Sequence, residues 1–200
     1  MDESRKMKKF EVIGKWIKHG SKVLVLGCGE GELINYLQKK SDARVFGLDI
    51  DEKKVFEAIS KGLSVIQGDI NCDLDDYSEK SFDHIIAHDI IQIMDKPDEI
   101  IRKLLKLSDN VIISFPNFAY IKIRLGVLFS GRMPKTSVLP YEWYDTPNIH
   151  LFTIRDFKVF CRKENIKITG EHYTGIGKKT IPVCMIPNLL AEFSYFRLTG

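Results

Sequence analysis

The chain has 200 residues, which is the size of one ordinary domain and is enough to bury a hydrophobic core. Its composition, 44% apolar and 28% charged, excludes an intrinsically disordered or fibrous protein. A net charge of +3 is too small for bulk electrostatics to indicate a nucleic-acid partner, and no apolar run approaches the length of a membrane span. We therefore expect one domain over residues 1–200, with no nucleic-acid partner and no membrane span.

Cysteine usage and the first residues favour the cytoplasm. The four cysteines lie far apart, with no C-x-x-C pair and no paired histidines, so reduced thiols and no metal site are expected. The basic start, residues 1–9, is not followed by the apolar stretch of a signal peptide. Cytoplasmic location is the expectation.

The first predicted element is an amphipathic helix. Apolar residues recur at helical spacing from Phe10 to Ile17 among lysines, and Gly20 is the predicted end of the helix. Its expected role is to cover one edge or face of a sheet.

The chain is organised around the stretch from Lys22 to Leu33. Residues 23–26 are valine and leucine, as in a strand that is buried on both faces of a parallel sheet. Three glycines then alternate before an amphipathic run: Gly27, Gly29 and Gly31. This order predicts a strand, a tight turn and a helix, with bare backbone and free N–H groups for a carboxylate or phosphate.

The glycine spacing narrows the choice of ligand. A dinucleotide fingerprint, G-x-G-x-x-G, would place its last glycine three positions after the second. Here Gly31 comes two positions after Gly29, and Glu32 follows. The segment resembles G-x-G-x-G of the class I S-adenosylmethionine (SAM) methyltransferases. The alternative is a strand–helix turn that binds nothing.

An acidic residue follows the second predicted strand, residues 43–49. Asp49 lies about twenty residues past the glycine turn, where a carboxylate can accept hydrogen bonds from both ribose hydroxyls. Asp49 or Asp51 could instead cap the following helix. We expect Asp51 to be the cap and Asp49 to be the ligand contact, with its neighbour Ile50 in the same site.

Polar residues also follow the next two predicted strands, residues 63–67 and 82–87. Asp69 can accept the adenine amino proton while Ile70 packs against the ring, although a simple turn aspartate is the alternative. His88 lies at the carboxyl end of its strand, where it can line the cofactor site or act as a general base. A hydrogen-bonded loop histidine remains equally open.

The alternation of strands and helices predicts the fold class. A helix from Pro97, a strand at 110–115, a helix at 154–163 and a strand at 166–169 continue the pattern. The last strand, 189–198, is expected to enter antiparallel, as is typical of methyltransferases. The prediction is an α/β, Rossmann-like class I methyltransferase fold with a seven-stranded, mostly parallel sheet.

A cap insertion interrupts this alternation at residues 118–150, after the fifth strand. Its first part is basic, which leaves open a membrane-surface helix, a cap over a substrate pocket or a docking surface. Polar and aromatic residues in and near its second part suit a pocket wall or a partner contact. The candidates for substrate or partner contact are Asn117, Tyr141, Trp143, Tyr144, Asn148 and His150.

Several stretches resemble the MetW family of methionine-biosynthesis proteins, members of the class I SAM-methyltransferase superfamily. The likeness covers nearly the whole chain. The glycine loop is shared with the wider superfamily, whereas the insertion and tail are more specific: Ser114–Phe118, Ser130–Pro134, Leu139–Tyr144, Thr146–His150 and Pro187–Glu192.

The resemblance implies a SAM-binding protein that works with a homoserine O-acyltransferase, and in several bacteria that transferase depends on its MetW partner. The cofactor would be SAM or its demethylated product, S-adenosylhomocysteine. By position, the glycine loop with Cys28 would hold the methionine part of SAM, Asp49 the ribose and Asp69 the adenine.

Two functions follow as hypotheses. The first is a binding module that activates or tunes the acyltransferase. The second is a small-molecule methyltransferase with an unknown acceptor, because methyl transfer from a sulfonium needs mainly alignment of the nucleophile. Whether the chain is an enzyme is left open. The resemblance supplies no catalytic residue, and His88 and His150 are the best candidates for a base.

Overall fold

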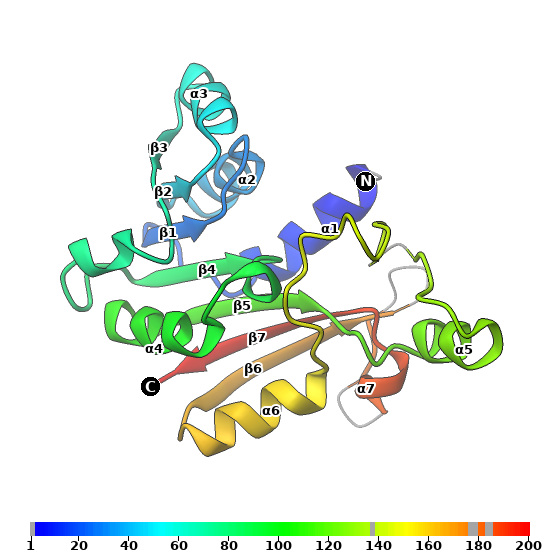
Figure 1. Ribbon diagram of the computed structural model, residues 1–200. Helices are drawn as coiled ribbons and strands as arrows, with labels where there is room; N and C mark the ends of the chain where they lie inside the picture. Colours follow the sequence, from blue (N-terminus) through cyan, green and yellow to red (C-terminus); the bar gives the residue numbers. More distant parts are fainter. Residues whose placement is uncertain (1–2, 137–138, 176–179, 183–185) are drawn as a thin grey trace.

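A computed structural model describes the chain except for residues 1–2, 137–138, 176–179 and 183–185. Seven strands form one sheet in the order β3-β2-β1-β4-β5-β7-β6 (Figure 1). β7 pairs antiparallel with both β5 and β6, whereas the other pairs are parallel. The strands are β1 (Lys22–Leu26), β2 (Arg44–Asp49), β3 (Ser64–Gln67), β4 (His84–His88), β5 (Val111–Pro116), β6 (Lys167–Thr174) and β7 (Phe193–Thr199). The expected fold is confirmed.

Helices cover both faces of the sheet (Figure 1). One buried cluster joins α1, α2 and α3 to one face, and a second joins α4 and α6 to the other. Alternate residues of the central strands supply the two clusters: Ile86 of β4 belongs to the first, and Ile85 and Ala87 to the second. The helices are α1 (Glu3–Gly14), α2 (Glu32–Ser41), α3 (Glu52–Ser60), α4 (Pro97–Leu107), α5 (Ile121–Ser130), α6 (Ile154–Lys163) and α7 (Pro187–Leu190).

Several element boundaries differ from the sequence prediction; β6, for example, runs from Lys167 to Thr174 where a strand at 166–169 was expected. α1 ends at Gly14 instead of Gly20, because Trp16 and Ile17 donate their backbone N–H groups three residues back, to Ile13 and Gly14. Both side chains nevertheless pack in the buried cluster that joins α1, α2 and α3 to the sheet. The last strand begins at Phe193, because Pro187 starts the short helix α7 instead.

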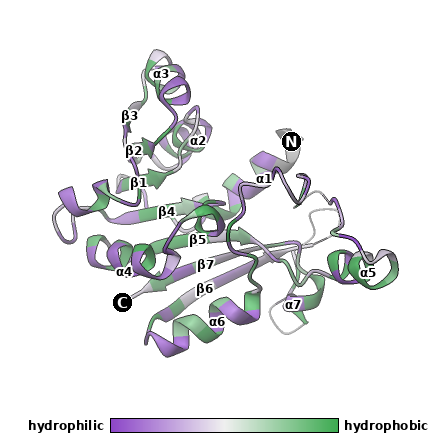
Figure 2. Ribbon diagram, in the orientation of Figure 1, coloured by the Kyte–Doolittle hydropathy of each residue, from purple (hydrophilic) through white to green (hydrophobic). Residues whose placement is uncertain are grey.

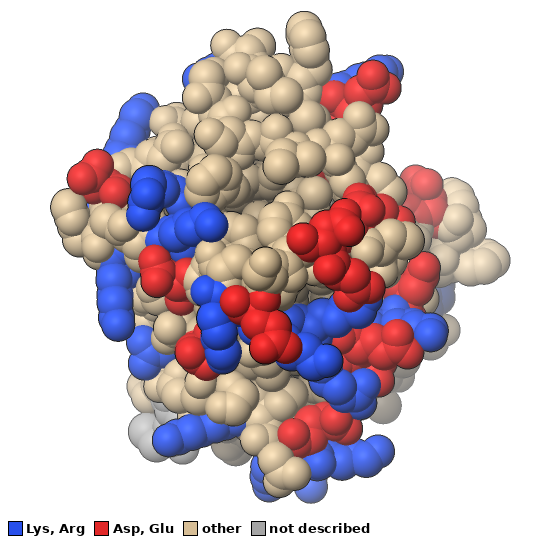
Figure 3. All heavy atoms as spheres, turned by 90° about the vertical axis from the view of Figure 1, so that its left-hand side faces the viewer, with Lys and Arg blue, Asp and Glu red and all other residues tan. Residues whose placement is uncertain are grey.

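Charges of both signs are interspersed on the face shown in Figure 3, the side of Figure 1 from which the parallel strands start. This view shows no continuous field of one sign. Within the described part of the chain, no helix has the length and apolar character required to cross a bilayer.

The start of α6 offers a simple stability test. The Thr153 hydroxyl accepts from Asp156 N, and the Asp156 carboxylate accepts from Thr153 N, which forms a capping box. We expect Thr153→Ala to lower the free energy of unfolding by about 1 kcal/mol. Urea denaturation should show less than about 0.5 kcal/mol for the exposed control Arg155→Ala. Equal effects of the two changes would contradict this role of Thr153.

Candidate cofactor site

The glycine turn after β1 leaves backbone open to a ligand. Gly27, Gly29 and Gly31 all have positive φ, at 60°, 55° and 80°, which side chains rarely adopt. At Gly27 and Gly31 a Cβ would collide with Ile90 and Leu63, respectively. At Gly29 it would meet only Lys54 Cδ, at 4.0 Å. The outer side of Gly29 is therefore the part of the turn that a ligand can approach.

Asp49 closes the base of this turn from the end of β2. Its Oδ2 accepts from Gly29 N at 2.6 Å, and its Oδ1 accepts from Asp51 N at 3.0 Å. An ionised carboxylate offers about four acceptor positions, so acceptor capacity remains for ligand hydroxyls. Asp51 itself accepts from Lys53 N and Lys54 N as the cap of α3, which confirms the expected cap.

Asp69 lies beside Asp49 at the adjoining strand end. The two ends are tied by Gly68 N, which donates to Asp49 O at 2.9 Å. Asp69 Oδ1 accepts from the backbone and side-chain nitrogens of Asn71, and this turn holds the carboxylate in place. Ile70 is buried in the core, whereas Ile50 is 67% exposed and offers an apolar surface beside Asp49. A ribose and an adenine ring suit this combination of groups.

His88 lies at the end of β4 with its ring between Phe10 and Phe193. Its Nδ1 is 2.5 Å from Ser114 Oγ. Burial, with a smaller contribution from the Lys9 ammonium, lowers the pKa of His88 to about 3, and the Asp89 carboxylate partly opposes this shift. A neutral histidine with so low a pKa is a weak base. His88 therefore suits a place in the wall of the site better than the role of a general base.

The pH dependence of stability tests this environment. Because the folded pKa lies below the ordinary value of 6.5, the unfolded chain binds a proton that the folded chain does not. Stability should therefore fall as pH drops from 6.5 towards 3. Since one histidine binds at most one proton, we expect His88→Gln to remove at most about 1.4 kcal/mol per pH unit of this loss.

Urea unfolding at several pH values in this window measures that slope. The exposed control His19→Gln should leave it unchanged. An unchanged slope in His88→Gln would show that His88 does not cause the acid sensitivity.

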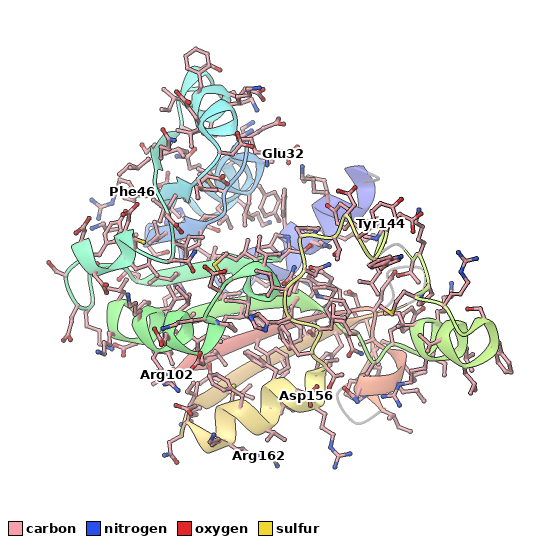
Figure 4. The ribbon with its side chains drawn as sticks, viewed as in Figure 1. Glu32, Phe46, Arg102, Tyr144, Asp156 and Arg162 are labelled. Carbon is pink, nitrogen blue, oxygen red and sulfur yellow. The ribbon has the colours of Figure 1, made fainter. Side chains whose placement is uncertain are left out.

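α1 supplies a residue that the sequence analysis missed. Lys9 Nζ lies 3.3 Å from Asp89 Oδ2 and 3.7 Å from the centre of the Phe193 ring. Nearby, Lys6 forms an ion pair with Glu32, which lies at the start of α2 (Figure 4). These contacts hold α1 across the ends of β4 and α2. The basic amphipathic pattern of the first helix was the only feature of the sequence that pointed to a role for Lys9.

The end of the insertion is bonded to the loop after β4. Ile149 N and His150 N both donate to Gln92 O, and Gln92 Nε2 donates to Asp89 Oδ1. His150 is therefore linked to the loop after β4 through its backbone. Its ring Nε2 lies 3.4 Å from Asp95 O. Asn148 Nδ2 donates to Thr146 Oγ1.

The aromatic candidates of the insertion are not enclosed. Tyr141, Trp143 and Tyr144 are 48%, 76% and 71% exposed, and the last two form an edge-to-face ring pair. Their exposure suits a contact with another molecule better than the wall of a closed pocket.

Asn117 has a different place from the other candidates. It is completely buried, its Nδ2 donates to Asn188 O and Ala191 O, and its Oδ1 accepts from Ala119 N and Ile154 N. These bonds use both the donors and the acceptor of the amide within the chain. Its evident role is to join the end of β5 to α6 and α7.

The Cys28 thiol lies within the glycine turn, beside Asp49. Burial raises the pKa of Cys28 to about 12, so its thiol stays protonated inside the turn.

A cavity of about 390 Å³ lies at the opposite edge of the sheet, beside Lys18 and Asp83. Ligands of open α/β sheets bind at the carboxyl ends of the strands, so this cavity is separate from the candidate site. Among the described residues, no group of three or more His, Cys, Asp or Glu is placed to hold a metal ion.

The sheet order, the antiparallel β7 and the glycine turn after β1 define the class I SAM-methyltransferase fold. A SAM-dependent methyltransferase from Archaeoglobus fulgidus has the same fold, with a TM-score of 0.70 and 14% identity over 97% of this chain and 92% of that one. The family described as "Methionine biosynthesis protein MetW" matches residues 7–198, and the chain belongs to this family.

The chain is also similar to two further proteins. The "Bifunctional methionine biosynthesis protein MetXA/MetW" of Rhodopirellula baltica is 29% identical over 91% of this chain, which spans only 31% of that protein. A Haloferax volcanii putative methyltransferase, solved as a complex with the Trm112 methyltransferase activator, has a TM-score of 0.68 and 13% identity over 98% of this chain and 91% of that one.

Proposed function

We propose that the chain binds SAM or S-adenosylhomocysteine and that it activates or tunes a homoserine O-acyltransferase of methionine biosynthesis. One observation supports ligand binding best: the Asp49 carboxylate accepts a hydrogen bond from Gly29 N at 2.6 Å, beside backbone that a ligand can approach. The fused MetXA and MetW parts of the R. baltica relative support the partner.

Each residue of the site has a proposed role. The backbone around Gly29 would hold the amino-acid part of the ligand, Asp49 the ribose hydroxyls and Asp69 the adenine amino group. Ile50 would pack against the base, and His88 would line the site. When bound, SAM supplies an electrophilic methyl group on its sulfonium sulfur.

Coupling between SAM and the acyltransferase gives a quantitative test. If SAM strengthens acyltransferase binding by some factor, the acyltransferase must strengthen SAM binding by the same factor. Calorimetric titrations of SAM and S-adenosylhomocysteine, each with and without the acyltransferase of the same organism, measure both factors. An acyltransferase whose rate and substrate affinity do not respond to this chain, with or without SAM, would overturn the proposal.

A small-molecule methyltransferase is the second candidate. The similarity of the fold to SAM-dependent methyltransferases favours it. The low pKa of His88 leaves alignment of a nucleophile as the main available source of catalysis. Conversion of SAM to S-adenosylhomocysteine with a metabolite extract should reveal an acceptor, and no turnover with any extract would count against this reading.

A further inference from the structure

One face of α5 packs against neighbouring parts of the insertion, in a small cluster separate from the two core clusters. Ile123 is buried against Tyr120 and Leu139. On the same side of the helix, Gly126 is close to Pro134, since a Cβ at Gly126 would lie 2.8 Å from Pro134 Cβ. These contacts fix which side of α5 turns outward.

The outward face of α5 is also apolar. Leu125, Leu128 and Phe129 follow one another at i, i+3 and i+4, so they lie on one side of the helix. They are 42%, 72% and 81% exposed. Figure 2 shows α5 as a hydrophobic helix at one end of the molecule. We name these three residues the α5 stripe.

Such a stripe normally faces a core, and an amphipathic helix that binds a partner lays this type of face into an apolar groove. Only Ile123 of α5 is buried, so the helix is attached through little of its own surface. A ten-residue helix is marginal without tertiary packing. A partner on the α5 stripe would supply the missing packing.

Charges beside the stripe indicate the chemistry of that partner. Lys122 and Arg124 flank the stripe and are exposed, and α5 has no acidic residue. Two copies of the chain that met stripe to stripe about a twofold axis would bring these cations together, which is unfavourable. A groove with an apolar floor and an acidic rim, on a different protein, is complementary to both features.

We propose that the α5 stripe is the surface by which this chain docks on the homoserine O-acyltransferase. The inference rests on the proposed function for the identity of the partner. It adds where the contact lies and what kind of groove receives it: an apolar groove with acidic residues at its rim.

The test compares two matched double variants. Leu128→Gln with Phe129→Gln removes the most exposed part of the stripe. Phe56→Gln with Ile59→Gln makes the same change on α3, where these residues are 72% and 52% exposed. Circular dichroism and urea unfolding first establish that both variants keep the fold.

Calorimetry with the acyltransferase of the same organism then gives the affinities. We expect the stripe variant to bind at least tenfold more weakly, about 1.4 kcal/mol, and the α3 variant to bind within twofold of the wild type. A wild-type affinity retained by the stripe variant, or lost only in the α3 variant, would overturn the docking surface and leave the proposed function intact.

Other occupants are distinguished by the same proteins. Sedimentation measures self-association, and vesicles of anionic phospholipid measure membrane binding. If the stripe variant loses either of these and still binds the acyltransferase, the inference is overturned, and the α5 stripe contacts a second copy of the chain or a membrane instead. No binding between the wild-type chain and the acyltransferase would overturn the proposed function itself.

Discussion

Asp49→Ala is expected to weaken SAM binding by about 1–3 kcal/mol, roughly 5- to 150-fold. The change removes a carboxylate that is positioned by Gly29 N and Asp51 N and that we propose bonds to the ribose hydroxyls. Titration calorimetry with SAM measures the affinity directly.

Asp51→Ala is the matched control for this change. It removes a neighbouring carboxylate that caps α3, so it should lower the free energy of unfolding by about 1 kcal/mol and leave SAM affinity unchanged. If Asp49→Ala binds SAM as tightly as the wild type, Asp49 does not contact the ligand.

Asn117→Ala is expected to lower the free energy of unfolding by at least about 3 kcal/mol. The substitution leaves the part-buried carbonyl of Asn188, the buried carbonyl of Ala191 and the N–H groups of Ala119 and Ile154 without their amide partner. Each buried polar group left unpaired costs about 1–3 kcal/mol, and the costs are not additive. Urea denaturation measures the loss.

Asn148→Ala provides the comparison, because this asparagine was predicted to have the same type of contact and differs in its surroundings. Its amide is bonded within the insertion to Thr146 and is only partly buried. We expect a change below about 1 kcal/mol. Similar losses in the two variants would mean that Asn117 has no special structural role.

Local sequence signals predicted most elements of the fold. The glycine turn and the Asp51 cap of α3 each depend on backbone groups within a few residues, so a short stretch contains all the interacting partners. The end of α1 at Gly14 was missed because the next N–H groups bond three residues back. The start of the last strand was missed because Pro187 begins α7 instead.

The candidate site was predicted in part. Its carboxylates follow directly from strand ends, because parallel strands deliver their carboxyl ends to one edge of the sheet. Lys9 could not be predicted, since its contact with Asp89 spans 80 residues and depends on where α1 packs.

The sequence by itself determined the order of strands and helices, the bare backbone at the turn and the family of the chain. The tertiary structure decided which chemically similar residues are enclosed and which face outward. It buried Asn117, left Trp143 exposed and turned the α5 stripe away from the core. The reason is physical: secondary structure and caps arise from neighbours along the chain, whereas burial depends on surfaces that only the complete packing brings together.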